Sequence, residues 1–94
     1  MTDNKWYITR GAADKVPVWL QRLIWFAVSE DYEKDYLQVF EVKTVNGDIE
    51  LTHSQEEPPF KKKYTLKMVT EPLDMKIYVI DDGLHITMML AEEY

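Results

Sequence analysis

The stretch YLQVFEVKTVNGDIELTHSQ, residues 36–55, decides the fold of this chain. Two runs of alternating apolar and polar residues flank Asn46 and Gly47. An Asn-Gly pair between such runs is the strongest short-range signal for a β-hairpin with a two-residue turn. The turn predicts that Val45 pairs with Asp48, and every other pair of the hairpin follows from that register.

The hairpin register also predicts which side of the sheet is covered. Lys43 lies opposite Glu50, and the two side chains are expected to form a cross-strand ion pair. The other face is mostly apolar and carries Phe40, Val42, Thr44, Ile49, Leu51 and His53. This division predicts one face in water and one face packed against another element.

The covering element is predicted to be an amphipathic helix within ADKVPVWLQRLIWFAVSEDYEK, residues 13–34. Asp14 is the expected N-cap, and Pro17 suits the first turn. With about 100° between successive residues, the arc expected to face the sheet consists of Val16, Trp19, Leu20, Leu23, Ile24, Phe26 and Ala27. Acidic residues at the C-terminal end oppose the helix dipole, so we expect the helix to fray before Asp35.

Three residues of this segment fall outside the arc and suggest a contact surface. Val18, Trp25 and Tyr32 follow one another at intervals of seven residues. An exposed tryptophan with apolar neighbours is typical of the anchors that dominate protein interfaces. We therefore predict that these three residues contact another protein. The alternative is that a loop or the C-terminal segment LAEEY, residues 90–94, folds over them.

The remaining strands complete the sheet. They are predicted in KWYITR (5–10), FKKKYTLKM (60–68), MKIYVID (75–81) and LHITMML (84–90). In the second of these runs, the side chains expected to face the core are Phe60, Tyr64, Leu66 and Met68. The order β-α-β-β-β-β-β predicts an α+β fold, with a mostly antiparallel sheet of about five to six strands and one amphipathic helix on one face. Residues 1–94 are expected to form a single domain.

The last two strands meet at Asp82 and Gly83, which predict a second two-residue turn. That turn pairs Ile80 with His85 and places alternate residues of both strands on one apolar face. Asp81 then points away from His85, whereas a metal site needs ligands that converge. The carboxylates here are therefore expected to serve the turn.

No catalytic, cofactor or metal site is expected from the other residues. The chain has no cysteine, which excludes disulfides and zinc–thiolate sites. Its glycines are scattered, and no serine stands at a triad spacing from a histidine and an acid. His53 is expected to be structural. The alternative is a small enzyme, which would require a pocket lined by His53 or His85 with converging carboxylates.

The charge balance argues against direct nucleic-acid binding, because 11 basic residues stand against 17 acidic ones, with a net charge of −6. The lysines of residues 61–63 are expected to protect an edge strand from aggregation. The sequence has neither an apolar run long enough for a transmembrane helix nor the order of a secretory signal. A cytoplasmic protein is predicted.

Several stretches also resemble a known family. They are YITRG (7–11), VPVWLQRLIWF (16–26), DYLQVFEV (35–42), KKKYTL (61–66) and VIDDGLHITMMLAEEY (79–94). With them the chain resembles, over nearly its full length, the uncharacterised Firmicutes family catalogued as domain of unknown function 960. The resemblance implies a cytoplasmic accessory protein of staphylococci, streptococci or lactic-acid bacteria, with a mobile element as one possible source. It carries no activity and no catalytic residue to transfer.

Taken together, these features predict a non-enzymatic protein that acts through protein–protein contact, either with a second copy or with an unknown partner. The first alternative is an acidic DNA mimic that inhibits a DNA-acting enzyme. Its surface would be built from Glu30, Asp31, Glu33, Asp35, Glu56 and Glu57. The second alternative is the small enzyme of unknown reaction.

Overall fold

The computed structural model describes residues 5–67 and 72–94. Its elements follow one another as β1 (Lys5–Ile8), α1 (Arg10–Lys15), α2 (Val18–Val28), β2 (Leu37–Val45), β3 (Asp48–Gln55), β4 (Phe60–Leu66), β5 (Met75–Asp81), β6 (His85–Leu90) and the 3-10 helix η1 (Ala91–Glu93). The six strands form one sheet in the order β1-β6-β5-β2-β3-β4. All neighbours are antiparallel except β1 and β6, which run parallel.

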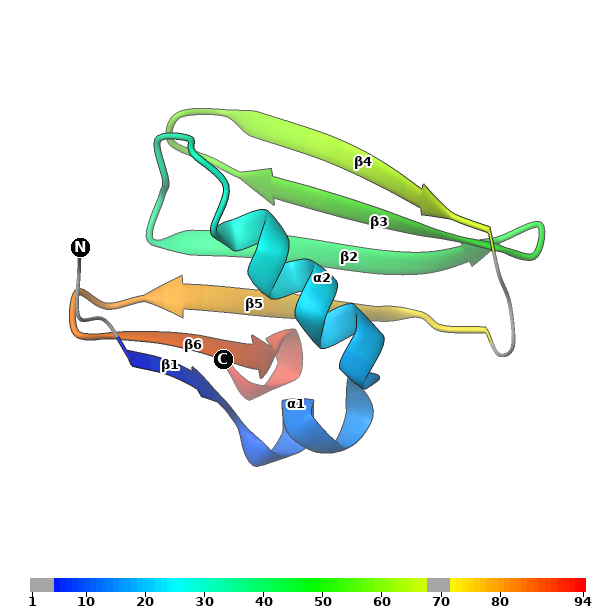
Figure 1. The fold of residues 1–94 in the computed structure, drawn as a ribbon, viewed down its shortest axis with the longest axis horizontal. Helices are drawn as coiled ribbons and strands as arrows, with labels where there is room; N and C mark the ends of the chain where they lie inside the picture. The colour runs from blue at the N-terminus through cyan, green and yellow to red at the C-terminus, as the bar shows by residue number, and fades with distance from the viewer. Residues whose placement is uncertain (1–4, 68–71) are drawn as a thin grey trace.

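Helix α2 crosses one face of this sheet, in front of β2 and β5 in the view of Figure 1. The core lies between the helix and the inner face of the strands. It consists of Ala12, Val16, Leu20, Ile24, Ala27, Val28, Phe40, Val42, Ile49, Leu51, Ile77, Val79, Ile86, Met88 and Leu90. The strand residues in this set alternate along each strand, as expected of a sheet with one covered face.

The predicted order with a single helix after the first strand is wrong, although the α+β class broadly fits. The helical segment is divided into α1 and α2, and the chain ends in η1. Pro17 causes the division, because a residue before proline disfavours the helical conformation. Val16 is accordingly extended, with φ −91° and ψ 117°.

The expected helix caps also need correction. Thr9, not Asp14, is the N-cap of the first helix, where its hydroxyl oxygen accepts the backbone N–H of Ala12 at 3.1 Å. Pro17 is the N-cap of α2, so it lies just outside the helix and not in its first turn. Helix α2 ends at Val28, before Asp35 as predicted.

The predicted apolar arc of the helix is partly wrong. Leu20, Ile24 and Ala27 are buried as expected, but Trp19 and Phe26 remain 40% and 62% exposed. The buried stripe includes Val28, which the prediction left out. An arc of about 160° is wider than the stripe that one helix buries against a sheet, so the residues at its edge stay in water.

The first hairpin has the predicted register. Val45 pairs with Asp48, and both Asn46 and Gly47 have positive φ, at 50° and 84°, as the favoured two-residue turn requires. Lys43 does pair with Glu50 across the strands. Its described ion pair is nevertheless with Glu41 along the same strand, at 3.8 Å between Nζ and Oε2.

The second hairpin is shifted by two residues from its predicted register. Ile80 pairs with Thr87, because the turn is centred on Gly83 and Leu84. The Asp82 carboxylate causes the shift, since its Oδ1 accepts the backbone N–H groups of Leu84 and His85 at 2.9 and 2.7 Å. A shift of two keeps every side chain on its predicted face.

The strands β1 and β4 form the two edges of the sheet. Phe60, Tyr64 and Leu66 of β4 are half-buried, while Lys61 and Lys63 are exposed. Met68, which was also predicted to face inward, lies outside the described residues. None of the helices in residues 5–67 and 72–94 has the length and apolar character to cross a membrane.

Candidate functional site

The three residues of the predicted contact surface lie in different surroundings. Val18 is exposed at the start of α2, while Trp25 packs edge-on against Trp6 of β1, with ring centroids 4.7 Å apart. Tyr32 lies beyond the end of α2, in the segment that leads to β2. The three side chains therefore do not form one helical stripe. Their role in binding a protein stays a prediction.

A different set of α2 residues faces outward. It consists of Val18, Trp19, Arg22 and Phe26, and we call it the outward α2 face. Val18, Trp19 and Phe26 are 59%, 40% and 62% exposed. Trp19 and Phe26 were not expected on this face, because the helical periodicity assigns them to the core-facing arc. The useful signal was the spacing of three and four residues that joins Trp19, Arg22 and Phe26.

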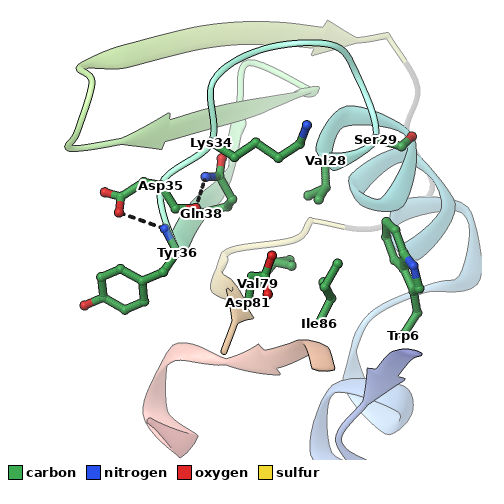
Figure 2. Close-up of a pocket in the computed structure, with 10 residues that line it drawn as sticks. All are labelled: Trp6, Val28, Ser29, Lys34, Asp35, Tyr36, Gln38, Val79, Asp81 and Ile86. Atoms are coloured by element: carbon green, nitrogen blue, oxygen red, sulfur yellow. Dashed lines mark hydrogen bonds between the residues drawn. The ribbon is translucent and has the colours of Figure 1, made fainter. Parts of the chain in front are cut away.

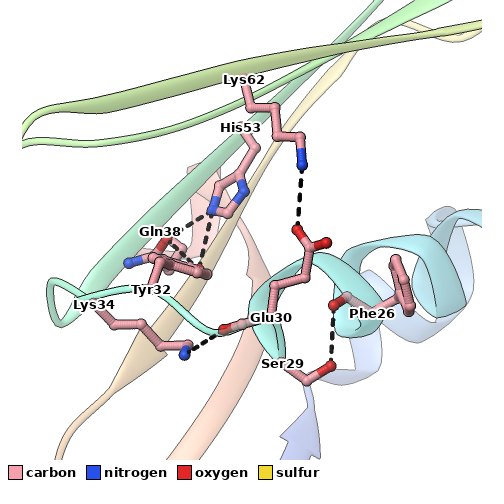
Figure 3. A network of polar contacts seen from close by, with 8 residues as sticks. All are labelled: Phe26, Ser29, Glu30, Tyr32, Lys34, Gln38, His53 and Lys62. Carbon is pink, nitrogen blue, oxygen red and sulfur yellow. Dashed lines mark hydrogen bonds and ion pairs between the residues drawn. The ribbon is translucent and has the colours of Figure 1, made fainter.

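The outward α2 face is held by bonds at both ends of the helix. Before its first turn, the Val16 carbonyl accepts a hydrogen bond from Gln21 Nε2 at 2.8 Å. After its last turn, the Ser29 hydroxyl donates to the Phe26 carbonyl at 3.0 Å, as Figure 3 shows. These bonds use polar groups that the helix ends would otherwise leave unpaired. The apolar side chains are thus presented by a fixed scaffold.

Tyr32 is half-buried and takes part in a polar network with the buried residues Gln38 and His53. Its hydroxyl donates to Gln38 Oε1 at 3.0 Å, and His53 Nε2 lies 2.7 Å from the same oxygen. Because this oxygen can only accept, His53 carries its proton on Nε2. Gln38 Nε2 donates to Gln55 Oε1 at 2.6 Å and to the Asp35 carbonyl at 2.9 Å. The network joins β2 and β3 to the segment after α2 (Figure 3).

Burial determines the protonation of this network. The pKa of His53 is lowered to about 4, mainly by burial, with Glu30 opposing the shift and Lys62 contributing to it. Burial also raises the pKa of Tyr32 to about 12, with Glu30 and Tyr64 acting in the same direction. Both side chains are therefore neutral near pH 7. Their partners are amide groups, so the geometry serves to hold the chain in place.

The acidic residues considered for a DNA mimic include two with intramolecular contacts. Glu30 forms an ion pair with Lys62 at 3.5 Å between Oε1 and Nζ (Figure 3). The Asp35 carboxylate accepts the backbone N–H groups of Tyr36 and Glu57 at 2.8 and 3.1 Å. These contacts give both residues a role in the fold. Mimicry of nucleic acid stays a prediction.

The two histidines do not share a site. His53 is buried and stacks on Phe40 with ring centroids 4.3 Å apart. His85 precedes the core residue Ile86 and so lies on the opposite sheet face, with its Nδ1 3.5 Å from Asp82 Oδ2. Hydrogen bonds from the turn backbone lower the pKa of Asp82. Within residues 5–67 and 72–94, no group of three or more possible metal ligands converges.

A cavity of about 540 Å³ opens where α2 ends over the sheet (Figure 2). Its lining comes from β1, β2, β5, β6, the end of α2 and the segment that follows. These residues are Trp6, Val28, Ser29, Lys34, Asp35, Tyr36, Gln38, Val79, Asp81 and Ile86. Neither histidine is among them. The cavity could not be predicted from the sequence, because its walls come together only in the folded chain.

The comparisons with known proteins identify a family and a similar fold, and they give no activity. The model of the family described as "Staphylococcal protein of unknown function (DUF960)" matches residues 5–93. A crystal structure of a protein of unknown function from Enterococcus faecalis has the same fold, with a TM-score of 0.84 and 22% identity. The similarity covers 100% of this chain and 93% of that one. No protein with a curated description matches the sequence.

Proposed function

The chain belongs to the DUF960 family of staphylococcal proteins of unknown function, as its sequence predicted, and from this premise we propose that it binds another protein through the outward α2 face. The observation that carries the proposal is the exposure of Val18, Trp19 and Phe26 on one side of a helix whose other side is buried. Large apolar side chains grouped on a surface mark interaction sites.

The chemistry of this face fits a protein partner. Tryptophan and arginine are the residues most often found at the energetic centre of interfaces, and both are present here as Trp19 and Arg22. Helix α2 packs on the sheet through Leu20 and Ile24, so the outward side chains start from a rigid backbone. A rigid binding surface loses little conformational entropy when a partner docks.

The charge on α2 favours a different protein over a second copy. Arg22 is the only charged residue in the helix. Two copies that packed this face about a twofold axis would bring Arg22 close to its own counterpart, because such an interface is self-complementary. No carboxylate on α2 would compensate this repulsion. We infer a partner that presents a carboxylate surrounded by apolar side chains.

The proposal is tested by capture from a lysate of the native host with matched variants. The double variant Trp19→Ala/Phe26→Ala removes the apolar anchors and should lose the captured partner, with binding weakened at least about tenfold. Arg22→Glu should weaken the binding of the same partner, because the new carboxylate would repel the carboxylate of the partner. The matched control is Tyr7→Ala, an exposed aromatic on β1, and it should retain the partner.

Partner binding and oligomeric state are read by quantitative mass spectrometry and sedimentation. Retention of every partner by the double variant, while its circular dichroism stays native, would refute the proposal. Sedimentation that shows a dimer abolished by the double variant would replace the proposed partner with a second copy. An accessory role for a mobile element, and the absence of enzymatic activity, stay predictions.

A further inference from the structure

The cavity at the end of α2 has the construction of a small-molecule site. Its floor is the inner face of the sheet, where Val79 pairs with Met88 and the neighbouring Asp81 pairs with Ile86. Val28 closes the cavity from the helix, and the indole of Trp6 forms a wall from β1, as Figure 2 shows. A volume of about 540 Å³ lies within the range of pockets that hold small organic ligands.

One carboxylate interrupts this apolar floor. The inward residues of β5 are Met75, Ile77, Val79 and Asp81, so the apolar series ends in an acid. Asp81 Oδ1 accepts the backbone N–H of Gly83 at 2.9 Å, and this bond orients the side chain. The second carboxylate oxygen has no described partner among the lining residues. It is an acceptor with unused capacity beside an apolar surface.

Three other polar residues of the lining, Lys34, Asp35 and Gln38, form hydrogen bonds within the protein. Gln38 uses its amide in the buried network. Lys34 Nζ donates to the Glu30 carbonyl at 2.8 Å and lies 4.3 Å from the Tyr32 ring centroid. Both Asp35 oxygens accept backbone N–H groups.

The lining carries two carboxylates and one ammonium group. The net charge of the lining is therefore negative.

We propose that this cavity binds a small organic cation with a flat apolar body. The ammonium group pairs with the free oxygen of Asp81 in a charge-assisted hydrogen bond. The apolar body lies on Val79 and Ile86, against the indole of Trp6. An aromatic body beside the indole gains an aromatic contact in addition to the apolar area that it buries. This site uses other residues than the outward α2 face, so either proposal can fail without the other.

Two probes of the same shape and opposite charge test the proposal. Phenethylammonium and phenylpropionate are titrated separately at equal ionic strength into the isotope-labelled protein, and two-dimensional NMR follows the shifts. Phenethylammonium should move the Trp6 indole N–H and the backbone amides of Asp81 and Ile86 along a saturable curve. Phenylpropionate should bind about fivefold more weakly, the upper end of the range for one partly exposed charge contact.

Matched variants assign the preference to one carboxylate. Asp81→Asn keeps an oxygen for the Gly83 N–H. It should reduce the ratio of the dissociation constants of the two probes to less than about twofold. Glu50→Gln makes the same change of charge on the other face of the sheet and should leave the difference intact. Trp6→Leu keeps an apolar wall but removes the aromatic contact, so it should weaken the binding of phenethylammonium by about threefold. If Asp81→Asn disturbs the NMR spectrum of the protein, the Trp6→Leu variant still tests the site.

Three outcomes would overturn the proposal. The first is equal binding of the two probes to the unaltered protein. The second is a loss of preference in Glu50→Gln as large as in Asp81→Asn, which would indicate attraction to the overall negative charge. The third is a set of shifts that do not saturate or that fall away from the cavity.

Discussion

Nε2 of His53 lies 2.7 Å from Oε1 of Gln38, inside the core, and donates its proton to that oxygen. The register of β2 and β3 stacks the imidazole on Phe40, and the amide of Gln38 links it to Gln55. Through this pair, the segment after α2 is tied to the sheet. Protonating a histidine in this position would place a charge in the core, which costs free energy.

The stability of the protein should fall as the pH decreases from about 6.5 to about 4. Burial lowers the pKa of His53 from 6.5 to about 4, so in this window the unfolded chain binds a proton that the folded chain does not. The stability that neutral His53 contributes is fully present above pH 6.5, the pKa in the unfolded chain. It is lost as the pH falls to about 4, the pKa in the folded protein. A shift of this size corresponds to about 3 kcal/mol.

Urea unfolding at a series of pH values measures this loss. In His53→Gln the pH dependence between 6.5 and 4.5 should flatten, because the titrating group is gone. The control His85→Gln keeps His53 and should retain the slope. An unchanged slope in His53→Gln would show that other groups cause the loss.

Trp25→Ala should destabilise the fold. The indole of Trp25 packs against the core and edge-on against Trp6, with ring centroids 4.7 Å apart. Its removal leaves a gap that should cost about 3 kcal/mol, the lower end of the range for a large aromatic. The adjacent exposed residue supplies the control, since Phe26→Ala should change the free energy of unfolding by less than about 0.5 kcal/mol. Equal costs for the two variants would contradict the packing described here.

Thr9→Ala should remove the N-cap of α1. The Thr9 side chain accepts the Ala12 N–H at 3.1 Å and donates to Glu93 Oε1 at 2.7 Å, which links α1 to η1. Loss of the cap should cost about 1 kcal/mol of stability. Thr9→Ser keeps both bonds and should recover most of it. Thermal unfolding of the two variants checks this, and a serine variant as weak as the alanine variant would exclude the hydrogen bonds as the cause.

Gly83→Ala should strain the second hairpin. Gly83 has a φ of +96°, a conformation that a residue with a Cβ adopts only at a cost. Space is not limiting, because no heavy atom lies within 4 Å of an added Cβ. The expected loss is about 1 kcal/mol, measured by chemical denaturation. Leu84→Ala alters the exposed neighbour in the same turn and should have little effect, so a larger loss there would argue against backbone strain.

Much of the sheet could be predicted from local patterns. Asn46 and Gly47 determine the register of β2 and β3, because a tight turn leaves no freedom in the pairs that follow it. The second turn was predicted one residue too early, since Asp82 binds the backbone with its side chain and becomes the residue before the turn. The division of the helix at Pro17 was also missed, although the proline itself gave the signal.

The candidate surface was harder to predict than the strands. Periodicity separates an apolar face from a polar one, but almost all of α2 is apolar, so its pattern does not show which side meets the sheet. Trp25 was expected in water and lies against Trp6, while Trp19 and Phe26 were expected in the core and lie exposed. The assignment depends on how the helix crosses the strands and on the position of β1.

The amino-acid sequence by itself determined the register of the first hairpin, the presence of the second, and the core-facing side of the strands from β2 to β6, because turn chemistry and alternation act between near neighbours. It also identified the family. Only the tertiary structure decided the outward α2 face, the His53–Gln38 bond and the cavity beside Asp81. The bond and the cavity join residues far apart in the chain, and the outward α2 face depends on how the helix packs on the sheet. Trp6 and Asp81 meet the same cavity only because β1 pairs in parallel with β6.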